Sequence, residues 1–359
     1  MYSSINCCAF KIKEDMRRTK VKVGIVGLGL NGRKHALAHA NSRKSELVAV
    51  CDRDEVKLRA FGAELGVRKL FTSIDELLAD TEIEAVSIHT PDGQHLEPFL
   101  KALEARKHIL IEKPLANTEA DVMTMFKAGR EHGSGLKIQV GYILRFNPLF
   151  EAIYTLVRKE MLGQIYYMEA DYVHNMTRKL KETDLASGRN WYLEDQIPMV
   201  SGGSHCIDLL RWIKGETPIS VFSCGNHFAF PQFPRDDCMV SIFKFPDGSI
   251  AKVGALWAPE CPRPPFYNLR IYGTKGTVEN DRLCVGGHLE PERNLCFEPI
   301  EAAKIEGHPY EPEVEDWLTA IIENTKVRTS LADGANSSMA ALLAVRAALE
   351  GAEMRIPTL

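Results

Sequence analysis

The sequence predicts two domains: an N-terminal α/β domain with a doubly wound parallel sheet, and a C-terminal α+β domain with a large, mostly antiparallel open sheet. A length of 359 residues fits two domains. From residue 21 to residue 141, short apolar runs alternate with helical segments, which is typical of a parallel sheet covered on both faces. From residue 219 to residue 289, strand-like runs follow one another without helices, which favours antiparallel pairing.

The first domain is expected at residues 21–141. Strands are predicted at 21–26, 46–51, 69–71, 84–89, 108–111 and 136–141, and helices at 31–40, 54–65, 96–106 and 118–132. Gly66 and Gly133 stand where helix C-caps are expected. Ser73 and Glu76 have the spacing of a capping box, so a short helix is expected to begin after Ser73.

The second domain is expected at residues 142–359. Helices are predicted at 148–159, 204–214, 311–324 and 333–352, and strands at 164–174, 219–230, 238–245, 249–257, 268–272 and 277–279. The compositions of 245–249 and 273–276 are typical of hairpin turns. Residues 1–20 show no such pattern, and we expect a disordered extension there. Translation that begins at Met16 is the alternative for that segment.

Composition and charge limit the classes of function. The formal net charge of −4 does not favour a dedicated nucleic-acid-binding protein, which more often has a basic balance. The longest apolar runs are far shorter than the ~20 residues of a membrane span, so we expect no membrane association. The nine cysteines include no CxxC pair. This predicts free thiols in a reducing compartment, here the cytoplasm, rather than a disulfide framework or a zinc site.

A glycine-rich turn joins the first predicted strand to the first predicted helix. Gly27, Gly29 and Gly32 form the pattern GxGxxG, with Leu28 and Asn31 between them. In this context the first glycine allows a tight turn, the second lets the backbone approach a pyrophosphate, and the third lets the helix pack on the strand. The N-terminus of the helix offers free amide groups and partial positive charge to phosphates. We therefore expect a dinucleotide to bind at these five residues.

Two charged residues follow the second predicted strand. Asp52 stands at about the offset expected for an acidic residue that binds the adenosine ribose. A carboxylate there accepts hydrogen bonds from the 2′-hydroxyl and repels a 2′-phosphate, which favours NAD. Arg53 follows directly and could meet a 2′-phosphate instead, so NADP is the alternative.

The predicted strand at 108–111 runs directly into Glu112, Lys113 and Pro114. A lysine at the carboxyl end of a parallel strand lies at the crevice where ligands of such sheets bind. Pro114 favours an extended backbone at Lys113, which restricts how the side chain is aimed. An ammonium group there can donate a hydrogen bond to a substrate hydroxyl and stabilise a developing alkoxide. From this turn alone, a surface lysine is the alternative.

His205 and Asp208 lie three residues apart in a predicted helix, so they are expected to share a face. A position near the helix N-terminus disfavours protonation of His205 and makes it available as a general base near neutral pH. A metal site would need a third and a fourth ligand at a recognisable spacing; we see none and expect no metal. From this segment alone, a capping or core histidine is the alternative.

Together, three segments resemble the signatures of the glucose–fructose oxidoreductase and inositol dehydrogenase family (Gfo/Idh/MocA). They are the glycine-rich turn at 27–32, the Glu-Lys-Pro turn at 112–114 and the segment 202–208 around His205. Segments 90–95 and 141–148 also resemble that family in order and spacing. The resemblance covers roughly residues 21–355, and the second and third segments are its specific part.

The resemblance implies an NAD(P)-dependent oxidoreductase that interconverts a secondary alcohol and a ketone on a sugar, an inositol or a related polyol. It implies a Rossmann fold for the first domain, and a homodimer or homotetramer formed through the sheet of the second. The nicotinamide would lie between the domains, near Lys113 and His205. Lys113 would orient the reacting hydroxyl, His205 would act as the base, and Asp208 would contact the substrate or the histidine.

The remaining site residues follow from the same resemblance. Cofactor contacts are implied for residues of the first domain: Thr90, Pro91, His95, Glu112 and Lys113. Substrate contacts are expected from the second domain: Arg145, Tyr172, Asn175 and Trp191.

One residue departs from the family pattern. Many inositol-dehydrogenase-like members carry an aspartate four residues before the histidine, and Ser201 occupies that position here. A serine hydroxyl cannot orient an imidazole or raise its basicity as a carboxylate does. The choice of base therefore stays open between His205 and Lys113.

Two other functions fit the same residues. One is a glycosidase or epimerase that retains NAD and oxidises and re-reduces its substrate without net redox change. The other is a non-enzymatic, nucleotide-responsive regulator. A regulator has no need of the site lysine, so the intact Glu-Lys-Pro turn argues against that function. Fold alone does not decide between the three.

Overall fold

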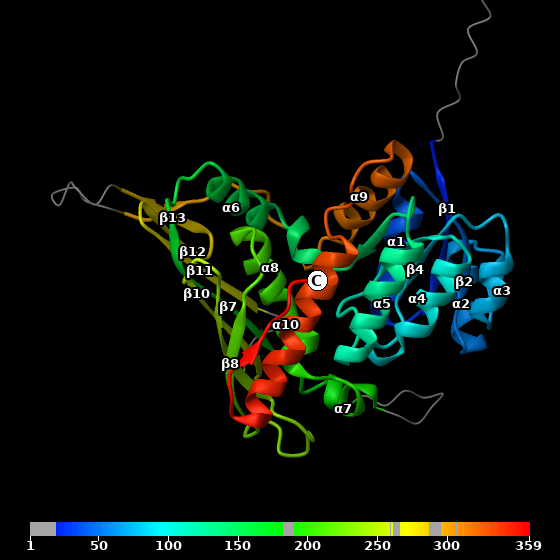
Figure 1. Ribbon diagram of the computed structural model, residues 1–359. Helices are drawn as coiled ribbons and strands as arrows, with labels where there is room; N and C mark the ends of the chain where they lie inside the picture. The colour runs from blue at the N-terminus through cyan, green and yellow to red at the C-terminus, as the bar shows by residue number, and fades with distance from the viewer. Residues whose placement is uncertain (1–18, 182–189, 259, 261–265, 287–295, 306) are drawn as a thin grey trace, which may run out of the picture.

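The computed structural model describes residues 19–181, 190–258, 260, 266–286, 296–305 and 307–359. It contains two sheets that lie side by side, with the long helix α10 (Leu331–Glu350) between them (Figure 1). Apart from residues 19 and 20, the extension predicted at 1–20 and the alternative start at Met16 lie outside the described residues.

The first sheet has six parallel strands in the order β3-β2-β1-β4-β5-β6. Its strands are β1 (Val21–Val26), β2 (Ser45–Cys51), β3 (Lys69–Phe71), β4 (Ala85–Ile88), β5 (His108–Ile111) and β6 (Ile138–Val140). All six predicted strands are confirmed, and so is the doubly wound parallel sheet. The strand order reverses between β1 and β4, and sheets of this kind bind ligands at that point, beyond the carboxyl ends of the strands.

Five helices connect these strands: α1 (Leu30–Asn41), α2 (Glu55–Leu65), α3 (Ile74–Ala79), α4 (Leu96–Glu104) and α5 (Glu119–His132). Gly66 ends α2 in the left-handed conformation, with φ of 68°, as predicted. Gly133 is the C-cap of α5. Ser73 is the N-cap of α3, but its side chain makes no capping hydrogen bond within the described chain. The capping box predicted for Ser73 and Glu76 is therefore wrong; a backbone bond from Leu77 to Ser73 starts this short helix instead.

The second sheet has nine strands in the order β14-β13-β12-β11-β7-β10-β9-β8-β15. They are β7 (Ile165–His174), β8 (Ser220–Asn226), β9 (Cys238–Lys244), β10 (Ile250–Trp257), β11 (Phe266–Gly273), β12 (Gly276–Glu279), β13 (Arg282–Val285), β14 (Glu298–Pro299) and β15 (Met354–Arg355). Only β7 and β10 pair in parallel, so the mostly antiparallel sheet is confirmed. Strands β13, β14 and β15 were not predicted, because they are short and lack a buried apolar run.

Three helices besides α10 precede or follow strands of this sheet: α6 (Pro148–Arg158), α7 (Trp191–Glu194) and α8 (Ser204–Lys214). Met168 and Ala170 of β7 belong to one buried cluster with Leu209 and Leu210 of α8. The amphipathic alternation of β7 therefore turns one face of the sheet toward α8 and α10. This packing fixes the N-terminus of α8 against the middle of the sheet.

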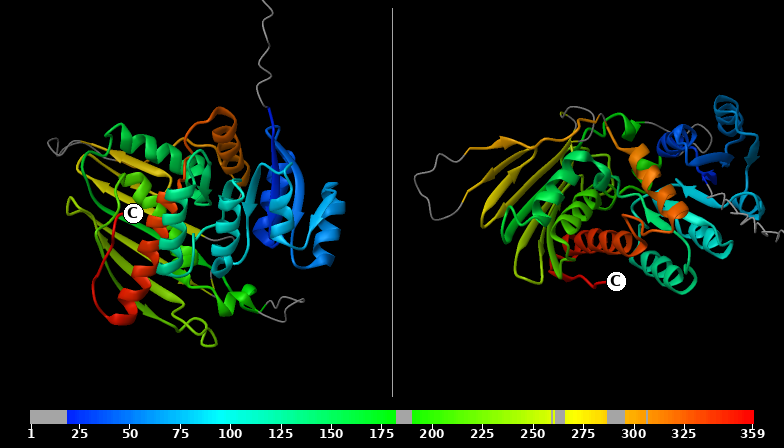
Figure 2. Two further views of the ribbon diagram at one scale, coloured as in Figure 1. Left: turned by 45° about the vertical axis from the view of Figure 1, so that its right-hand side comes forward. Right: turned by 90° about the horizontal axis from the view of Figure 1, so that it is seen from above.

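Helix α9 (Tyr310–Glu323) comes late in the chain but packs on the first sheet, beside α1 (Figure 2). Val314, Trp317 and Leu318 join the buried cluster that contains Val23 and Ile25 of β1. The boundary at residue 142 stays a prediction, and α9 shows that C-terminal residues also complete the core of the first sheet. Among the helices of the described segments, none has the length and apolarity needed to cross a membrane.

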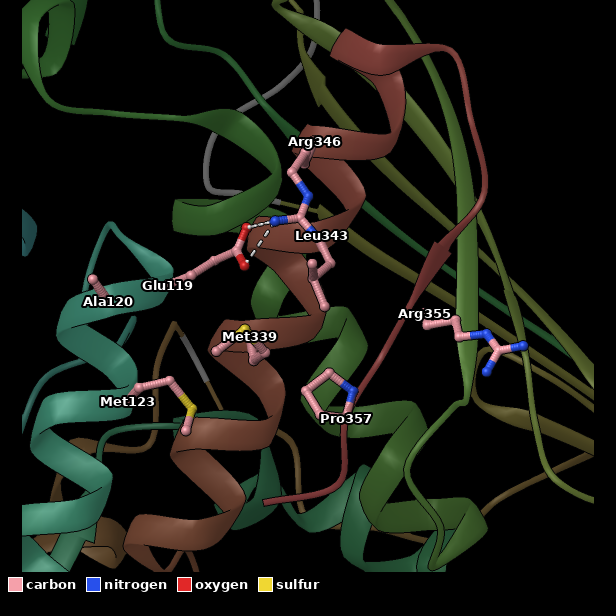
Figure 3. A pocket seen from close by; sticks show the side chains of 8 residues that line it. All are labelled: Glu119, Ala120, Met123, Met339, Leu343, Arg346, Arg355 and Pro357. Carbon is pink, nitrogen blue, oxygen red and sulfur yellow. Dashed lines mark hydrogen bonds and ion pairs between the residues drawn. The ribbon is translucent and has the colours of Figure 1, made fainter.

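A surface hollow of about 420 Å³ lies between α5 and α10 (Figure 3). Glu119 and Arg346 form an ion pair on its rim, in which Arg346 Nη1 donates to both Glu119 oxygens at 2.9 and 3.0 Å. Its lining comes from α5, α10 and the C-terminal segment, so it is a different place from the carboxyl ends of β1, β4 and β5.

Candidate active site

The three glycines after β1 lack side chains for different reasons. Gly27 has φ of 89°, and a Cβ there would lie 2.7 Å from the His89 carbonyl oxygen. A Cβ at Gly32 would lie 1.9 Å from the Gly27 carbonyl oxygen. The fold itself therefore requires both glycines. Gly29 has an ordinary φ of −64°, and a Cβ there would meet no described atom within 4 Å. The space beside Gly29 is thus open to a ligand.

Helix α1 begins without the partners that usually satisfy a helix N-terminus. No described side chain caps its first amides, and its first turn contains no acidic residue. Most helices have a polar N-cap or an acidic first turn, because the first amides are unpaired and partly positive. A pyrophosphate fits this uncapped end next to Gly29. The residues present therefore fit a dinucleotide.

Asp52 is held beside the same turn. Its Oδ2 accepts a hydrogen bond of 2.7 Å from the Leu28 amide, and its Oδ1 accepts one of 2.9 Å from the Asp54 amide. These bonds fix the orientation of the carboxylate, while Arg53 is exposed next to it. The geometry suits a carboxylate that accepts a further hydrogen bond from a ribose hydroxyl.

We expect Gly29→Ala to keep the stability of the wild type but to weaken NADH binding by about tenfold or more, which is about 1.4 kcal/mol. The added methyl group would occupy space that the protein leaves open. Gly32→Ala is the matched variant, and it should also lower the urea midpoint, because its methyl group meets the Gly27 carbonyl oxygen. NADH fluorescence titration and urea unfolding measure the two effects. Unchanged NADH affinity in Gly29→Ala would contradict the phosphate site.

His95 joins the loops that follow β4 and β5. Its Nδ1 lies 2.9 Å from the Pro114 carbonyl oxygen, and its Nε2 lies 3.0 Å from the Thr90 carbonyl oxygen. The side chain is completely buried. The cofactor contact implied for His95 stays a prediction; in this structure the side chain joins the loops of Thr90 and Pro114.

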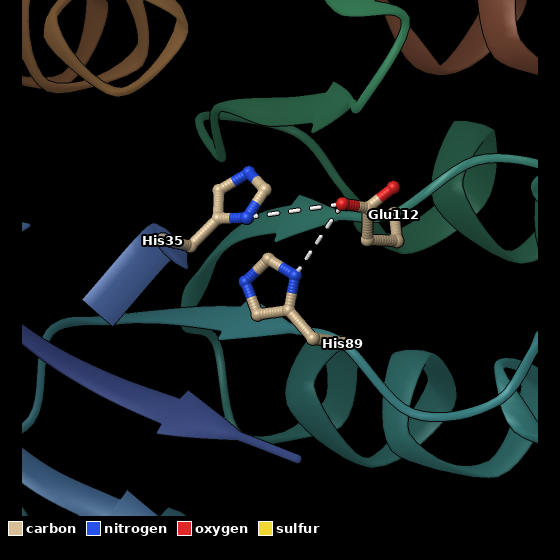
Figure 4. A group of neighbouring side chains, drawn as sticks. All are labelled: His35, His89 and Glu112. Atoms are coloured by element: carbon tan, nitrogen blue, oxygen red, sulfur yellow. Dashed lines mark ion pairs between the residues drawn. The ribbon is translucent and has the colours of Figure 1, made fainter. Parts of the chain in front are cut away.

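Glu112 lies in a cluster with two histidines (Figure 4). Its Oε1 is 3.8 Å from Nδ1 of His35 and 3.8 Å from Nδ1 of His89. These three atoms lie within 4.8 Å of one another, and the residue types are ones that bind metals. His35 already uses both nitrogens, however: Nδ1 donates to the Asn31 carbonyl oxygen at 3.1 Å, and Nε2 is hydrogen-bonded to the Glu313 carboxyl group at 3.0 Å.

The cluster is therefore better described as a buried ion network. Burial works against a charged His35, but the hydrogen bond to Glu313 and the charge of Glu112 raise the pKa of His35. Burial likewise opposes a charged Glu112, but the His89 imidazole 3.8 Å away and the charges of His35 and Lys113 lower the pKa of Glu112. Because both nitrogens of His35 are engaged in hydrogen bonds, His35 has no free nitrogen for a metal ion. The network instead fixes Glu112 directly beside Lys113.

Lys113 links the two domains. Its Nζ donates a hydrogen bond of 2.6 Å to the carbonyl oxygen of Ser201. Ser201 belongs to the π-helical turn η4 (Met199–Gly203), which leads directly into α8. The Lys113–Pro114 peptide bond is cis. The ammonium group at the end of β5 therefore lies at the turn that carries His205.

His205 lies in the first turn of α8 and is only 4% exposed. The rings of Tyr142, Tyr267 and His308 surround it edge-on, with centroids 6.2, 5.9 and 6.0 Å away. Burial, and then the charge of Lys113, holds the pKa of His205 well below its usual value. Its Nδ1 is buried and has no hydrogen-bond partner among the described residues. The imidazole is thus neutral at physiological pH and able to accept a proton.

Two of these neighbours, Tyr267 and His308, were not indicated by the sequence. The Tyr267 hydroxyl lies 3.4 Å from His308 Nε2, and the ring of His308 stacks against Tyr310 at 5.8 Å. Burial, and then the charge of Lys113, lowers the pKa of His308 to about 4. Both residues lie far from His205 in the chain and in no recognisable motif, so only the folding of β11 and α9 brings them to the site.

Tyr172 lies beside the same turn, as expected for a residue near the substrate. A Cβ at Gly202 would lie 2.3 Å from the Tyr172 ring, so Gly202 allows this close approach. The ring centroid of Tyr172 is 5.5 Å from that of Tyr267. A substrate contact of Tyr172 is therefore a proposal that the geometry supports.

Asn175 and Trp191 flank residues 182–189, which lie outside the described chain. The Asn175 Oδ1 accepts a hydrogen bond of 3.1 Å from the Thr177 amide, within its own loop. Trp191 begins α7 and stacks on Tyr192, with ring centroids 4.1 Å apart. The substrate contacts predicted for Asn175 and Trp191 stay predictions.

Arg145 and Asp208 form a buried ion pair. Arg145 Nε and Nη2 donate to the two Asp208 oxygens at 2.8 and 2.7 Å, and the Ser337 hydroxyl of α10 donates to Asp208 at 2.9 Å. Arg145 is 3% exposed and Asp208 is 1% exposed. In this structure the two side chains are paired with each other, so the substrate contact predicted for Arg145 and the substrate or histidine contact predicted for Asp208 stay predictions. Both charges are used to join α8 to its neighbours.

Two models of protein families match this chain. Residues 21–142 match the model of an oxidoreductase family with an NAD-binding Rossmann fold, and residues 150–279 match the model of the GFO/IDH/MocA C-terminal domain. The first matched region contains the glycine-rich turn and Lys113, and the second contains His205.

Individual relatives are distant but span most of the chain. A 2,7-anhydro-N-acetylneuraminate hydratase from Escherichia coli (strain K12) is 26% identical over 274 residues, which are 75% of this chain and 70% of the relative. A myo-inositol 2-dehydrogenase from Thermotoga maritima is 25% identical over 276 residues, 73% of this chain and 76% of the relative. A crystal structure of scyllo-inositol dehydrogenase from Lactobacillus casei, with bound NAD(H) and scyllo-inositol, has a TM-score of 0.77 and 23% identity; the match covers 94% of this chain and 99% of that chain. Because the two family models together span most of its length, the chain belongs to the Gfo/Idh/MocA family of oxidoreductases.

Proposed function

We propose that this protein is an NAD-dependent dehydrogenase that interconverts a secondary alcohol and a ketone on a sugar, an inositol or a related polyol. The observation that carries this proposal is the 2.6 Å hydrogen bond from Lys113 to Ser201, because it brings an ammonium group to the turn that holds His205. Oxidation of an alcohol needs a cationic donor, which stabilises the charge on the hydroxyl oxygen, and a neutral base, which accepts the hydroxyl proton. Relatives named as inositol dehydrogenases support the substrate class.

The site residues divide the chemistry between them. When bound, the nicotinamide supplies the hydride acceptor for alcohol oxidation. Lys113 donates a hydrogen bond to the reacting hydroxyl oxygen and stabilises the negative charge that develops on it. His205 accepts the hydroxyl proton, and its low pKa lets it release that proton again rather than retain it. The aromatic rings around His205 exclude water from this transfer.

The test is a search for the substrate with the cofactor content known. The purified protein is first assayed for bound NAD(H), and NADH formation is then followed with inositols, aldoses, amino sugars and sugar acids. Net NADH with one class supports the proposal and names its substrate. Bound NAD, an altered substrate and no net NADH would instead favour the NAD-retaining alternative. A protein that binds no dinucleotide and alters no substrate would overturn the proposal.

We propose NAD as the preferred cofactor because of the fixed carboxylate of Asp52. Asp52→Ala is expected to shift the ratio of kcat/KM values toward NADP by about tenfold or more, because the repulsion of a 2′-phosphate is lost. Arg53→Ala should leave NAD use unchanged. Asp75→Ala, which removes an exposed carboxylate on α3, serves as the control. A cofactor ratio equal to the wild type in Asp52→Ala would remove the ribose assignment.

We further propose a homo-oligomer that forms through the outer face of the nine-stranded sheet. Several apolar side chains on β8, β9 and β10 are exposed there: Phe222, Val240, Ile242 and Ile250. A contiguous apolar patch of this kind marks an interaction surface. Light scattering that gives the mass of a single 40.2 kDa chain would contradict this proposal.

The proposed compartment is the cytoplasm. The six described cysteines are all free thiols: Cys51, Cys206, Cys224, Cys238, Cys284 and Cys296. Free thiols, two of them fully buried, suit a reducing compartment. The other three cysteines lie outside the described residues.

A further inference from the structure

Asp92 brings a buried carboxylate from the first domain to the turn before His205. It begins the short 3-10 turn η1 (Asp92–Gln94) after β4 and is only 8% exposed. Its Oδ2 accepts hydrogen bonds from Ser201 Oγ at 3.1 Å and from Gln196 Nε2 at 2.8 Å. Both donors belong to the second domain and are themselves buried. Asp92 therefore touches the catalytic turn, although no sequence motif marks it as a site residue.

Ser201 is the point where Asp92 and Lys113 meet. The Ser201 carbonyl oxygen accepts the hydrogen bond from Lys113, and the Ser201 hydroxyl donates to Asp92. A positive and a negative group are thus held by the two polar groups of one residue. Burial raises the pKa of Asp92, and the charge of Lys113 opposes that rise. The two charges therefore interact in a water-poor region, where electrostatic effects are strong.

Because Ser201 stands four residues before His205, the carboxylate expected at that position is absent. We propose that Asp92 supplies that negative charge from the other domain, through Ser201, and that it is a positioning residue for Lys113 and for the turn of His205. This inference rests on the proposed dehydrogenase function. The negative charge of Asp92 and the ammonium group of Lys113 are held on the same residue, Ser201, which keeps the ammonium group at the turn where it can donate to the substrate hydroxyl. Asp92 also ties the two domains together at the reacting centre.

Variants that remove the negative charge of Asp92 but keep its shape distinguish this role from a purely structural one. In Asp92→Asn the amide oxygen can still accept hydrogen bonds from Ser201 and Gln196, so a structural tie would survive. The negative charge would be lost. In Ser201→Asp two carboxylates would lie within hydrogen-bond distance, and one of them would have to take up a proton. In the double variant, Asp92→Asn with Ser201→Asp, the site would again hold one carboxylate.

The first experiment compares these three variants with the wild type on an active substrate. We expect kcat to fall by about 10-fold to 100-fold in Asp92→Asn, the size typical of a lost group that assists proton transfer, with NADH affinity within about twofold of the wild type. Ser201→Asp should also lose activity and shift its pH profile upward. The double variant should recover most of the loss, because the two changes are coupled. Asp75→Asn, on exposed α3, is the control with a removed carboxylate.

The second experiment needs neither substrate nor cofactor. The rate at which an acylating reagent modifies Lys113 is followed by mass spectrometry in the wild type and in Asp92→Asn. Loss of the nearby negative charge weakens the electrostatic attraction that holds the Lys113 side chain at Ser201, so the rate should rise by about threefold or more. This readout tests Asp92 even if no sugar or polyol proves to be a substrate, which would be a failure of the proposed function alone.

The inference would be overturned by either of two results. One is a wild-type rate of Lys113 acylation in Asp92→Asn. The other is a loss of activity in Asp92→Asn that the double variant with Ser201→Asp does not restore. That result would mean that Asp92 has a structural role and that its charge is not needed. Recovery in the double variant together with faster acylation in Asp92→Asn would support it.

Discussion

Lys113→Met is expected to lower kcat by at least about 100-fold, equivalent to about 2.7 kcal/mol of transition-state stabilisation, while NADH affinity stays within about threefold of the wild type. Methionine keeps the length and apolar volume of the side chain but removes the charge. The ammonium group is the donor that the reacting hydroxyl would meet, and its hydrogen bond to Ser201 holds it at that place. The dinucleotide has its main contacts elsewhere, at the glycine-rich turn.

Lys113→Arg is the companion variant, because it keeps the charge and changes the geometry. Steady-state kinetics with NAD and the substrate found in the panel measure kcat, and NADH fluorescence measures binding. Urea unfolding shows whether the loss of the bond to Ser201 alters stability. If Lys113→Met turned over the true substrate at a rate close to that of the wild type, Lys113 would have no part in the chemistry and the mechanism would be wrong.

The elements that could be predicted are those whose signal is local. The inner strands of the first sheet, such as β4, are buried on both faces, so each appears in the sequence as an apolar run between turn residues. The glycine-rich turn and the Glu-Lys-Pro turn likewise depend on neighbouring residues. The structure places Gly29, Asp52 and Lys113 where the strand ends meet, as the sequence predicts.

The features that could not be predicted depend on contacts between distant segments. His205 and Asp208 are three residues apart in a helix, and that spacing suggested a shared role. Arg145 and Ser337, from two other elements, take up the carboxylate of Asp208 instead. Tyr267 and His308 reach His205 only because β11 and the segment before α9 fold over α8.

The interaction of Asp92 with Ser201 is the clearest case, since the two residues come from different domains. The sequence shows a serine at position 201 where a carboxylate is expected, and only the structure shows that the carboxylate of Asp92 lies beside it. Helix α9 is a second case: it completes the core of the first sheet, although its residues lie near the end of the chain. Sequence periodicity identifies an apolar face but not the face that it packs against.

The second large effect is expected at the buried ion pair. Arg145→Met should lower the free energy of unfolding by about 3 kcal/mol, because it removes the bidentate cation of the buried Asp208 carboxylate and leaves only Arg211, 3.9 Å away. Burial opposes a charged Arg145, but Asp208 and Asp333 raise the pKa of Arg145, so the guanidinium group stays charged. The urea midpoint, followed by circular dichroism, measures the loss. Arg346→Met is the control, since Arg346 also pairs with a carboxylate, Glu119, through its Nη1, but on the surface (Figure 3). It should cost less than about 1 kcal/mol.

The double variant Arg145→Met with Asp208→Leu separates the structural role from a role in substrate binding. Replacement of a whole buried ion pair by apolar side chains of similar volume is often close to neutral, whereas removal of one partner is not. We therefore expect the double variant to regain much of the stability that Arg145→Met loses, less the hydrogen bond from Ser337 to Asp208. Its KM for the substrate should stay near that of the wild type. A double variant that is stable but has lost substrate affinity would support the direct contacts that the sequence predicted for Arg145 and Asp208, and would show that the pair opens during turnover.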